Sequence, residues 1–114
     1  MTTAWDGLPN TVKTFMTALN DREDARALAT FTADAVVIDD GRSYTGRDEI
    51  GAWLAASVSG SEYTYTSEFT GATTTATTVD VGQHLDGNFP GGVADLHYRF
   101  TLDGALISQL VIEP

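Results

Sequence analysis

A chain of 114 residues has the size of one domain, and we expect a single domain over residues 1–114. Sixteen acidic residues against six basic ones give a formal charge of −10, which excludes nucleic acid and anionic membranes as partners because such a surface repels phosphate. The absence of cysteine excludes disulfides and thiolate metal sites, and without a signal peptide or spanning segment in the sequence we expect a cytoplasmic protein.

The first half of the chain has mainly helical spacing. One face of a first helix is formed by apolar residues at positions 12, 15, 16 and 19. A second, short helix is predicted over residues 23–31 and a third over residues 45–58, closed by the segment 59–61. Between them, the β-branched run of residues 34–39 predicts a strand.

From residue 62 onward the apolar residues alternate with a period of two, which is typical of strands. We predict strands over residues 62–71, 72–85, 93–104 and 105–114. The sequences at 70–72 and 102–105 are interpreted as tight turns of an antiparallel meander. Helices first and strands later indicate an α+β domain, with the helices covering one face of a curved sheet.

Three stretches carry a resemblance to a known group: ALNDREDARALATFTADAVVIDDG, YTGRDEIGAWL and GNFPGGVADLHYRFTLDGALISQLVI. They resemble the nuclear-transport-factor-2-like (NTF2-like) superfamily, which includes the SnoaL-like polyketide cyclases and the ketosteroid isomerases. The resemblance implies a cone-shaped fold, in which N-terminal helices pack on a strongly bent, mainly antiparallel sheet that encloses a pocket. It also implies a homodimer. The third stretch is similar to small SnoaL-like proteins of unassigned activity.

The resemblance to the isomerases can be tested at their catalytic positions. Asp39 lies at the position of their general base, at the end of the strand DAVVID. Phe15 stands where they have an oxyanion-binding tyrosine, and Leu96 where they have a protonated carboxylic acid. Since one such donor is worth about 2.7–4 kcal/mol of transition-state stabilisation, the loss of both argues against steroid isomerisation. A SnoaL-type aldol cyclisation is still compatible with the sequence.

Two readings of Asp39 stay open at this point. It is either a pocket carboxylate that acts as a base, or a strand-end residue that accepts backbone hydrogen bonds in the following turn. Strand alternation does not choose, because Val37 shares a face with Asp39 and Ile38 shares the other face with Asp40, so both faces are apolar. Asp40 is predicted to be a turn residue.

Aromatic side chains on the apolar faces are predicted to line a ligand pocket, with an ordinary core role as the alternative. The predicted ligand-binding residues are Phe15, Trp53, Tyr65, Phe69, Tyr98 and Phe100. Among them, the hydroxyls of Tyr65 and Tyr98 could donate to a ligand oxygen, which Phe15 cannot do.

Two sequence pairs raise the alternative of a metal site: His84 with Asp86, and Asp95 with His97. We expect no metal, because Asp95 and His97 alternate against the apolar set and should point outward. Together with Arg99 and Thr101 on the same face, they are predicted to form part of the homodimer interface.

The sequence therefore predicts a SnoaL-like protein that binds a small hydrophobic, carbonyl-containing ligand and needs no cofactor. The predicted chemistry is acid–base catalysis with Asp39 as the base, in a cyclase, isomerase or dehydratase. The alternative is a non-catalytic binding or dimerisation module with the same fold.

Overall fold

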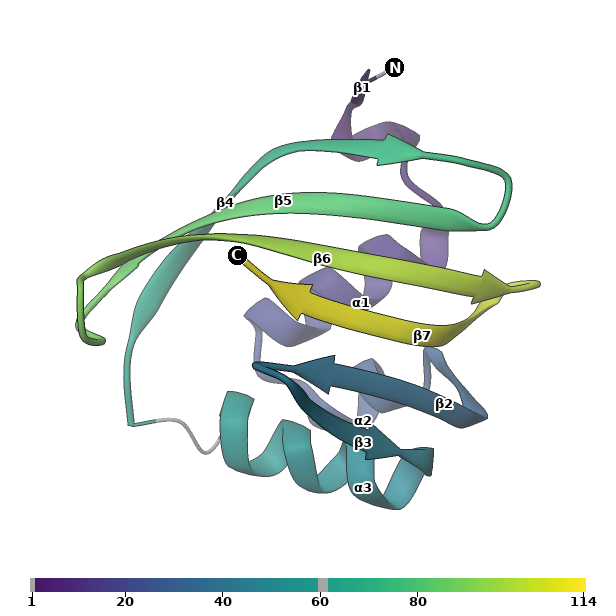
Figure 1. Cartoon of the computed structure of the whole chain (residues 1–114), viewed down its shortest axis with the longest axis horizontal. Helices are drawn as coiled ribbons and strands as arrows, with labels where there is room; N and C mark the ends of the chain where they lie inside the picture. Colours follow the sequence, from purple (N-terminus) through teal and green to yellow (C-terminus); the bar gives the residue numbers. More distant parts are fainter. Residues whose placement is uncertain (1, 60–61) are drawn as a thin grey trace.

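The computed structural model of the chain describes residues 2–59 and 62–114. Within them, seven strands form one sheet, in the order β1-β4-β5-β6-β7-β2-β3, and the helices lie on one side of it (Figure 1). The helices are α1 (Asn10–Asn20), α2 (Asp24–Leu28) and α3 (Gly46–Trp53), with a 3-10 helix at Trp5–Gly7 and a π-helical continuation of α3 at Leu54–Ser59. The strands are β1 (Thr2–Thr3), β2 (Phe31–Asp39), β3 (Arg42–Thr45), β4 (Tyr65–Thr74), β5 (Thr78–Gly87), β6 (Val93–Asp103) and β7 (Leu106–Glu113).

The predicted α+β class and the mainly antiparallel, cone-type sheet are confirmed. Every pairing in the sheet is antiparallel except that of β2 with β7. A parallel pairing needs a long crossover connection, and here the chain between β2 and β7 contains β3, α3 and the strands β4 to β6. None of the helices in residues 2–59 and 62–114 is long and apolar enough to cross a membrane.

Helix α1 lies against the inner face of the sheet and supplies its apolar side to the core. The predicted stripe is buried: Val12, Phe15, Met16 and Leu19, with Ala18 beside them. The Phe15 ring meets Phe31 and Phe100 edge-on, with centroids 5.4 and 5.6 Å apart. Edge-to-face pairs of this kind add to the hydrophobic stabilisation of the core.

The strand register arranges the inner face in rows, because residues directly paired on neighbouring strands point to the same side. One row runs Val37, Leu110, Phe100 and Val79, and it is entirely apolar and buried. The next row runs Asp39, Ile112, Tyr98 and Val81. A third pairs Phe69, Gln83 and Leu96. Of these three rows, only the second and the third contain polar side chains.

Several predicted boundaries are wrong in informative ways. The second helix ends at Leu28 rather than at residue 31, since Phe31 already belongs to β2 and packs in the core. The short strands β1 and β3 were not predicted. The third helix begins as expected, whereas its predicted end at 59–61 lies partly outside the described residues.

The predicted turn at 70–72 is also wrong, and with it the strand predicted over 72–85. Strand β4 continues to Thr74, and the turn follows at residues 75–77, where the Thr78 backbone N–H donates to Thr75 Oγ1 at 3.0 Å. Gly71 instead forms part of a bulge, with φ 146° and a register shift between Phe69 and Gly71. A bulge bends and twists a strand, which helps β4 curl over the helices. The predicted turn at 102–105 is confirmed by the β6–β7 hairpin.

Candidate functional site

The turn after β2 determines which of the two adjacent carboxylates ends the strand. Asp39 pairs with Arg42 across the β2–β3 hairpin, which leaves Asp40 and Gly41 as a two-residue loop. Both have positive φ, 53° and 77°, as a type I′ turn requires. The prediction that Asp40 is a turn residue is confirmed, and Asp39 is the last paired residue of the strand.

The side chain of Asp39 is held by a tryptophan from α3. The indole Nε1–H of Trp53 donates to Asp39 Oδ2 at 2.9 Å. Trp53 is only 2% exposed and packs against Tyr44, with ring centroids 6.2 Å apart. A buried indole N–H needs a partner, and Asp39 provides it. The hydrogen bond occupies one carboxylate oxygen and orients the other.

Asp39 lines a cavity of about 260 Å³, which we call the Asp39 cavity. Trp53, Tyr65 and Tyr98 contribute to the same wall. Much of the rest is aliphatic: Leu19, Leu85, Ala94, Leu96 and Ile112. A largely apolar wall with a few placed polar groups is the usual composition of a small-molecule site.

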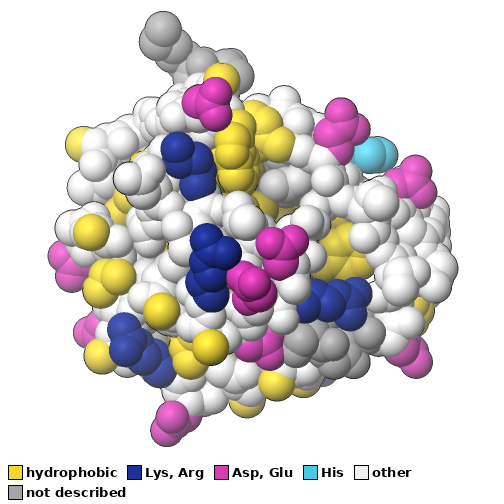
Figure 2. Space-filling model, turned by 180° about the vertical axis from the view of Figure 1, so that it is seen from behind, with side chains coloured by type: hydrophobic (Ala, Val, Ile, Leu, Met, Phe, Trp, Pro, Cys, Tyr) yellow, Lys and Arg dark blue, Asp and Glu magenta, His cyan; other side chains and the backbone are white. Residues whose placement is uncertain are grey.

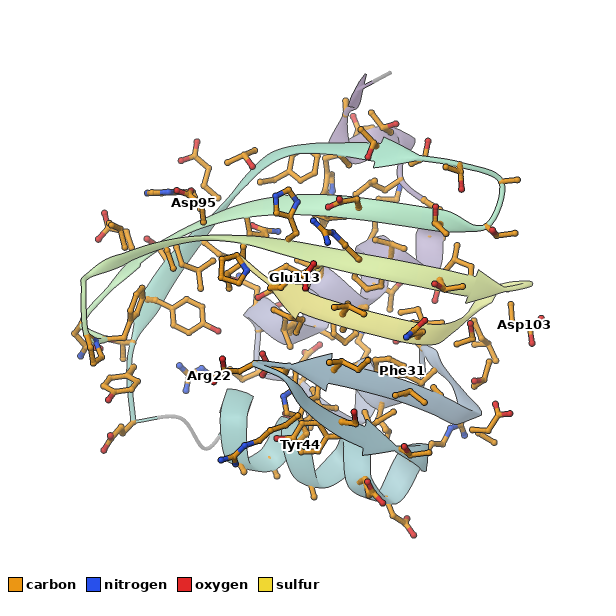
Figure 3. All side chains as sticks on the ribbon, in the orientation of Figure 1. Arg22, Phe31, Tyr44, Asp95, Asp103 and Glu113 are labelled. Atoms are coloured by element: carbon orange, nitrogen blue, oxygen red, sulfur yellow. The ribbon has the colours of Figure 1, made fainter. Side chains whose placement is uncertain are left out.

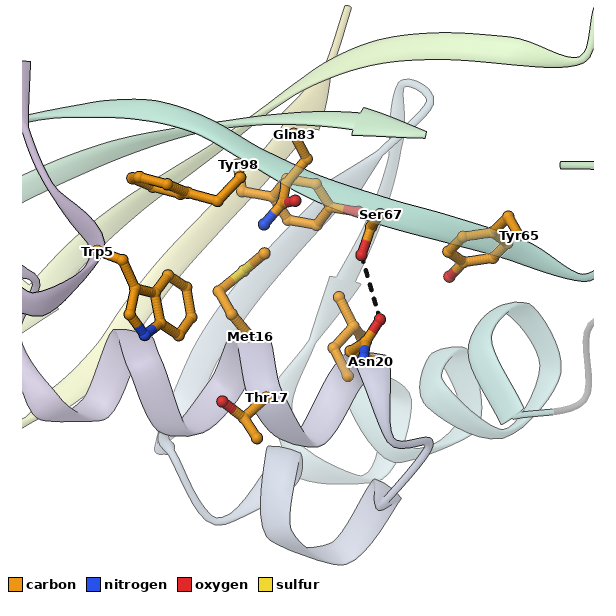
Figure 4. Close-up of a pocket in the computed structure, with 10 residues that line it drawn as sticks. Trp5, Met16, Thr17, Asn20, Tyr65, Ser67, Gln83 and Tyr98 are labelled. Atoms are coloured by element: carbon orange, nitrogen blue, oxygen red, sulfur yellow. Dashed lines mark hydrogen bonds between the residues drawn. The ribbon is translucent and has the colours of Figure 1, made fainter. Parts of the chain in front are cut away.

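A second cavity of about 270 Å³ adjoins the first, and we call it the Gln83 cavity (Figure 4). Leu19, Tyr65 and Tyr98 line both cavities. At its edge, the Ser67 hydroxyl donates to Asn20 Oδ1 at 3.1 Å and ties β4 to the end of α1. The two cavities thus lie on either side of a shared set of side chains.

Tyr98 occupies the wall common to both cavities and is 7% exposed. Burial raises the pKa of its phenol well above the usual 10.0, and the nearby Tyr65 and Asp39 raise it further. A raised pKa keeps the phenol protonated throughout the physiological range. Tyr98 is therefore a neutral hydrogen-bond donor close to the Asp39 carboxylate.

The six aromatic residues of the predicted pocket divide into two groups. Trp53, Tyr65, Phe69 and Tyr98 line one or both cavities. Phe15 and Phe100 lie in the core and line neither cavity. Gln83 was not predicted to line the pocket, although the alternation of Val79, Val81 and Leu85 marks it as a lone polar residue on a buried strand face.

The outer face of the sheet carries a charged network (Asp95 and Glu113 in Figure 3). His84 Nδ1 lies 2.7 Å from Asp95 Oδ1, and His97 Nδ1 lies 2.8 Å from Asp80 Oδ1. Arg99 pairs with both Asp80 and Glu113. The hydrogen bond that His84 donates to the Asp95 carboxylate raises the pKa of His84.

The outward orientation expected for Asp95 and His97 is confirmed, since both are exposed. Among residues 2–59 and 62–114, no three His, Asp or Glu side chains gather in a group that could hold a metal. On the opposite face, acidic and basic side chains are interspersed with patches of hydrophobic atoms (Figure 2).

Three solved structures illustrate what the chain is similar to. A proposed polyketide cyclase from Sinorhizobium meliloti is 28% identical with a TM-score of 0.86, over 97% of this chain and 100% of that one. A ketosteroid isomerase-like fold protein from Catenulispora acidiphila DSM 44928, in complex with trimethylamine, is 19% identical with a TM-score of 0.80, over 93% and 85%. An NTF2-like protein of unknown function from Cytophaga hutchinsonii ATCC 33406 is 13% identical with a TM-score of 0.70, over 93% and 90%. No family model and no curated protein matches the chain.

Proposed function

From the fold that this chain shares with nuclear-transport-factor-2-like proteins, we propose that it catalyses acid–base chemistry on a small hydrophobic ligand with a carbonyl group. Asp39 is the base in this proposal. The observation that carries it is a carboxylate fixed by a buried indole N–H at the wall of an apolar cavity.

The proposed first step is removal of a proton from the carbon next to the ligand's carbonyl. The free oxygen of Asp39 takes the proton, the C–H electron pair forms the enolate double bond, and the carbonyl electrons move onto oxygen. Tyr98 donates its hydroxyl proton in a hydrogen bond to that oxygen, since its raised pKa keeps it protonated. A positioned base contributes about 10²–10⁴-fold to such a step.

Tyr98 supplies in this proposal what the two isomerase-like positions lack. Phe15 lies in the core, and Leu96 presents an aliphatic side chain to the Asp39 cavity. The subsequent step distinguishes a cyclase, an isomerase and a dehydratase, which all begin with the same enolate. The test therefore addresses the shared step. The small molecule held by one structural neighbour, trimethylamine, supports a ligand-binding role for the fold.

Proton removal can be measured with a model ketone, 2-tetralone, so the natural substrate need not be known. Proton NMR in D₂O follows the exchange of its α protons for deuterium. We expect the protein to accelerate exchange of the α protons over buffer, and Asp39→Asn to abolish the acceleration. Tyr98→Phe should reduce it by about 10²–10³-fold. Asp40→Asn is the matched control, because it changes the neighbouring turn carboxylate and should exchange like the wild type. Equal acceleration by Asp39→Asn and the wild type would disprove the proposed base.

We also propose that the protein forms a homodimer and that it is located in the cytoplasm. The dimer would use the outer sheet face around Asp95, His97 and Arg99. Arg99 is already paired with Asp80 and Glu113 within its own chain, so covering this face leaves no unpaired arginine. Light scattering should give twice the 12.2 kDa chain mass at micromolar concentration, and a monomer would contradict it.

A further inference from the structure

Arg22 occupies a backbone position that normally favours glycine. Helix α1 ends in a Schellman motif, in which the Glu23 N–H donates to Ala18 O at 2.8 Å and the Arg22 N–H donates to Leu19 O at 3.2 Å. The residue after the cap then takes a left-handed conformation, and Arg22 has φ 57°. Such a φ is unfavourable for a residue with a Cβ, and nothing in the cap itself requires an arginine. The reason for an arginine at this position must lie in what its side chain contacts.

The Arg22 side chain reaches from the end of α1 to the segment that leads into β4 (Figure 3). Its Nη2 donates to the backbone carbonyl of Tyr63 at 3.1 Å. The side chain is exposed, and among the described residues it forms no ion pair. Its hydrogen bond therefore ties the end of a helix to a segment that follows 41 positions later in the chain.

Tyr63 lies where the Asp39 cavity meets solvent. It is 37% exposed and lines that cavity, whereas Trp53, on the same lining, is only 2% exposed. Tyr65 and Phe89 also line the cavity and are half-buried, and their rings meet edge-on with centroids 6.5 Å apart. We call the side chains of Tyr63, Tyr65 and Phe89 the mouth of the Asp39 cavity.

The pairing of β4 with β5 continues beyond the ends of the two strands and couples the mouth residues. The Asn88 N–H donates to Thr64 O at 3.1 Å, and Asn88 Oδ1 accepts from the Thr64 N–H at 2.8 Å. The same register sets Tyr63 opposite Phe89, on the face that also carries Tyr65. A contact that fixes the Tyr63 backbone therefore also positions Phe89.

We infer that Arg22 is a positioning residue that holds the mouth closed over the Asp39 cavity, and that a ligand enters when the hydrogen bond from Arg22 to Tyr63 opens. An exposed hydrogen bond suits this role, because its small net worth lets it open and close readily. The inference concerns access to the cavity, so it holds whether or not Asp39 acts as a base.

Acrylamide quenching of Trp53 fluorescence measures this access without a ligand. Trp53 is buried and lines the Asp39 cavity, so the quencher should reach it when the mouth opens. A Trp5→Phe background leaves Trp53 as the sole tryptophan of the chain. In that background, Arg22→Gly should raise the quenching rate constant about two- to tenfold, the range that the loss of one hydrogen bond allows. Acrylamide is uncharged, so the lost positive charge does not act on the quencher itself.

Two variants serve as controls for the quenching measurement. Arg22→Lys keeps a cationic donor and should stay close to the background. Asp40→Gly is the matched control for backbone strain, because Asp40 is the other described non-glycine residue with a positive φ. Its turn belongs to the β2–β3 hairpin, whose Tyr44 packs against Trp53 on a side away from the mouth residues. Asp40→Gly should leave the quenching unchanged.

Thermal unfolding distinguishes positioning of the mouth from a role in the fold. Glycine relieves the left-handed strain at position 22, so Arg22→Gly should melt at the same or a higher temperature than the background, despite the lost hydrogen bond. A lower melting temperature would make Arg22 a structural residue and overturn the inference. Unchanged quenching in Arg22→Gly would overturn it as well. An equal rise in Asp40→Gly would do the same, because the quencher would then reach Trp53 from the hairpin side.

Discussion

The two ends of the sheet's inner face use the same strands but are built differently. At one end, the row with Val37 and Phe100 is covered by α1, and Phe15 fills the space between helix and sheet. At the other, the row with Asp39 and Tyr98 faces the two cavities. The rows are two residues apart along each strand, about 7 Å. The covering element, rather than the strand, decides whether an inward residue is core or pocket wall.

The difference in cover also accounts for where polar groups occur. Around Phe15, close packing leaves no room for water or ligand, so a polar side chain would stay without a partner. Beside the cavities, Asp39, Tyr98 and Gln83 are each tolerated on a face that is otherwise apolar. Substitutions at the covered end should therefore act on stability, and substitutions at the open end on binding and ionisation.

The largest effect is expected at the covered end. Phe100→Ala should lower the free energy of unfolding by about 3–5 kcal/mol, because it leaves a cavity beneath α1 and removes the ring contact with Phe15. Tyr98→Phe, two residues away on the same strand, keeps its ring and should change stability by less than about 1.5 kcal/mol. Urea unfolding measures both. Similar losses for the two variants would break the distinction between core and pocket wall.

A smaller loss is expected when Asp39 no longer accepts from Trp53. Asp39→Ala leaves the buried indole N–H without its partner and should cost about 1–3 kcal/mol. Asp39→Asn retains an acceptor oxygen and should cost less. Asp40→Asn serves as the control and should be near neutral, since asparagine suits a positive φ in a type I′ turn. Chemical unfolding of the three variants checks the order, and a lower stability of Asp39→Asn than of Asp39→Ala would contradict it.

Tyr98 should add an alkaline limit to stability. Its pKa is about 10.0 when unfolded and higher when folded, so above pH 10 the unfolded state loses a proton that the native state keeps. Unfolding is then favoured by up to about 1.4 kcal/mol per pH unit, whereas below pH 10 the two states carry the same charge at this residue. The wild type should lose this stability between pH 10 and 11 relative to Tyr98→Phe. Parallel pH profiles of the two proteins would refute the burial of an un-ionised phenol.

The smallest effect is expected on the outer face, where His84 is paired with Asp95. The hydrogen bond raises the pKa of His84 above 6.5, so its stabilising contribution is fully present below pH 6.5 and is lost as pH rises through the folded value. NMR titration should show Asp95→Asn lowering the pKa of His84. Asp86→Asn should lower it less, because Asp86 acts only through its charge. Equal shifts in the two variants would argue against the hydrogen bond.

Much of the fold could be predicted from local patterns, and the failures were equally local. Helix α1 and strands β6 and β7 follow from clear periodicity. Gly71 was mistaken for a turn because a glycine permits both a turn and a bulge, and only pairing with β5 distinguishes them. Strand β1 has two residues, too few for any period to be visible.

The sequence by itself determined the class of the fold, the alternation that turns Tyr65 and Tyr98 inward, and the Asp-Gly loop that makes Asp40 a turn residue. Only the tertiary structure decided that Asp39 faces the cavity, because both faces of its strand are apolar and the pairing of Asp39 with Ile112 selects one of them. It also decided that Phe15 and Phe100 are core whereas Tyr98 is pocket wall. Their sequence patterns are alike, and the distinction depends on whether a side chain packs in the core around Phe15 or lines the cavities beside Leu19.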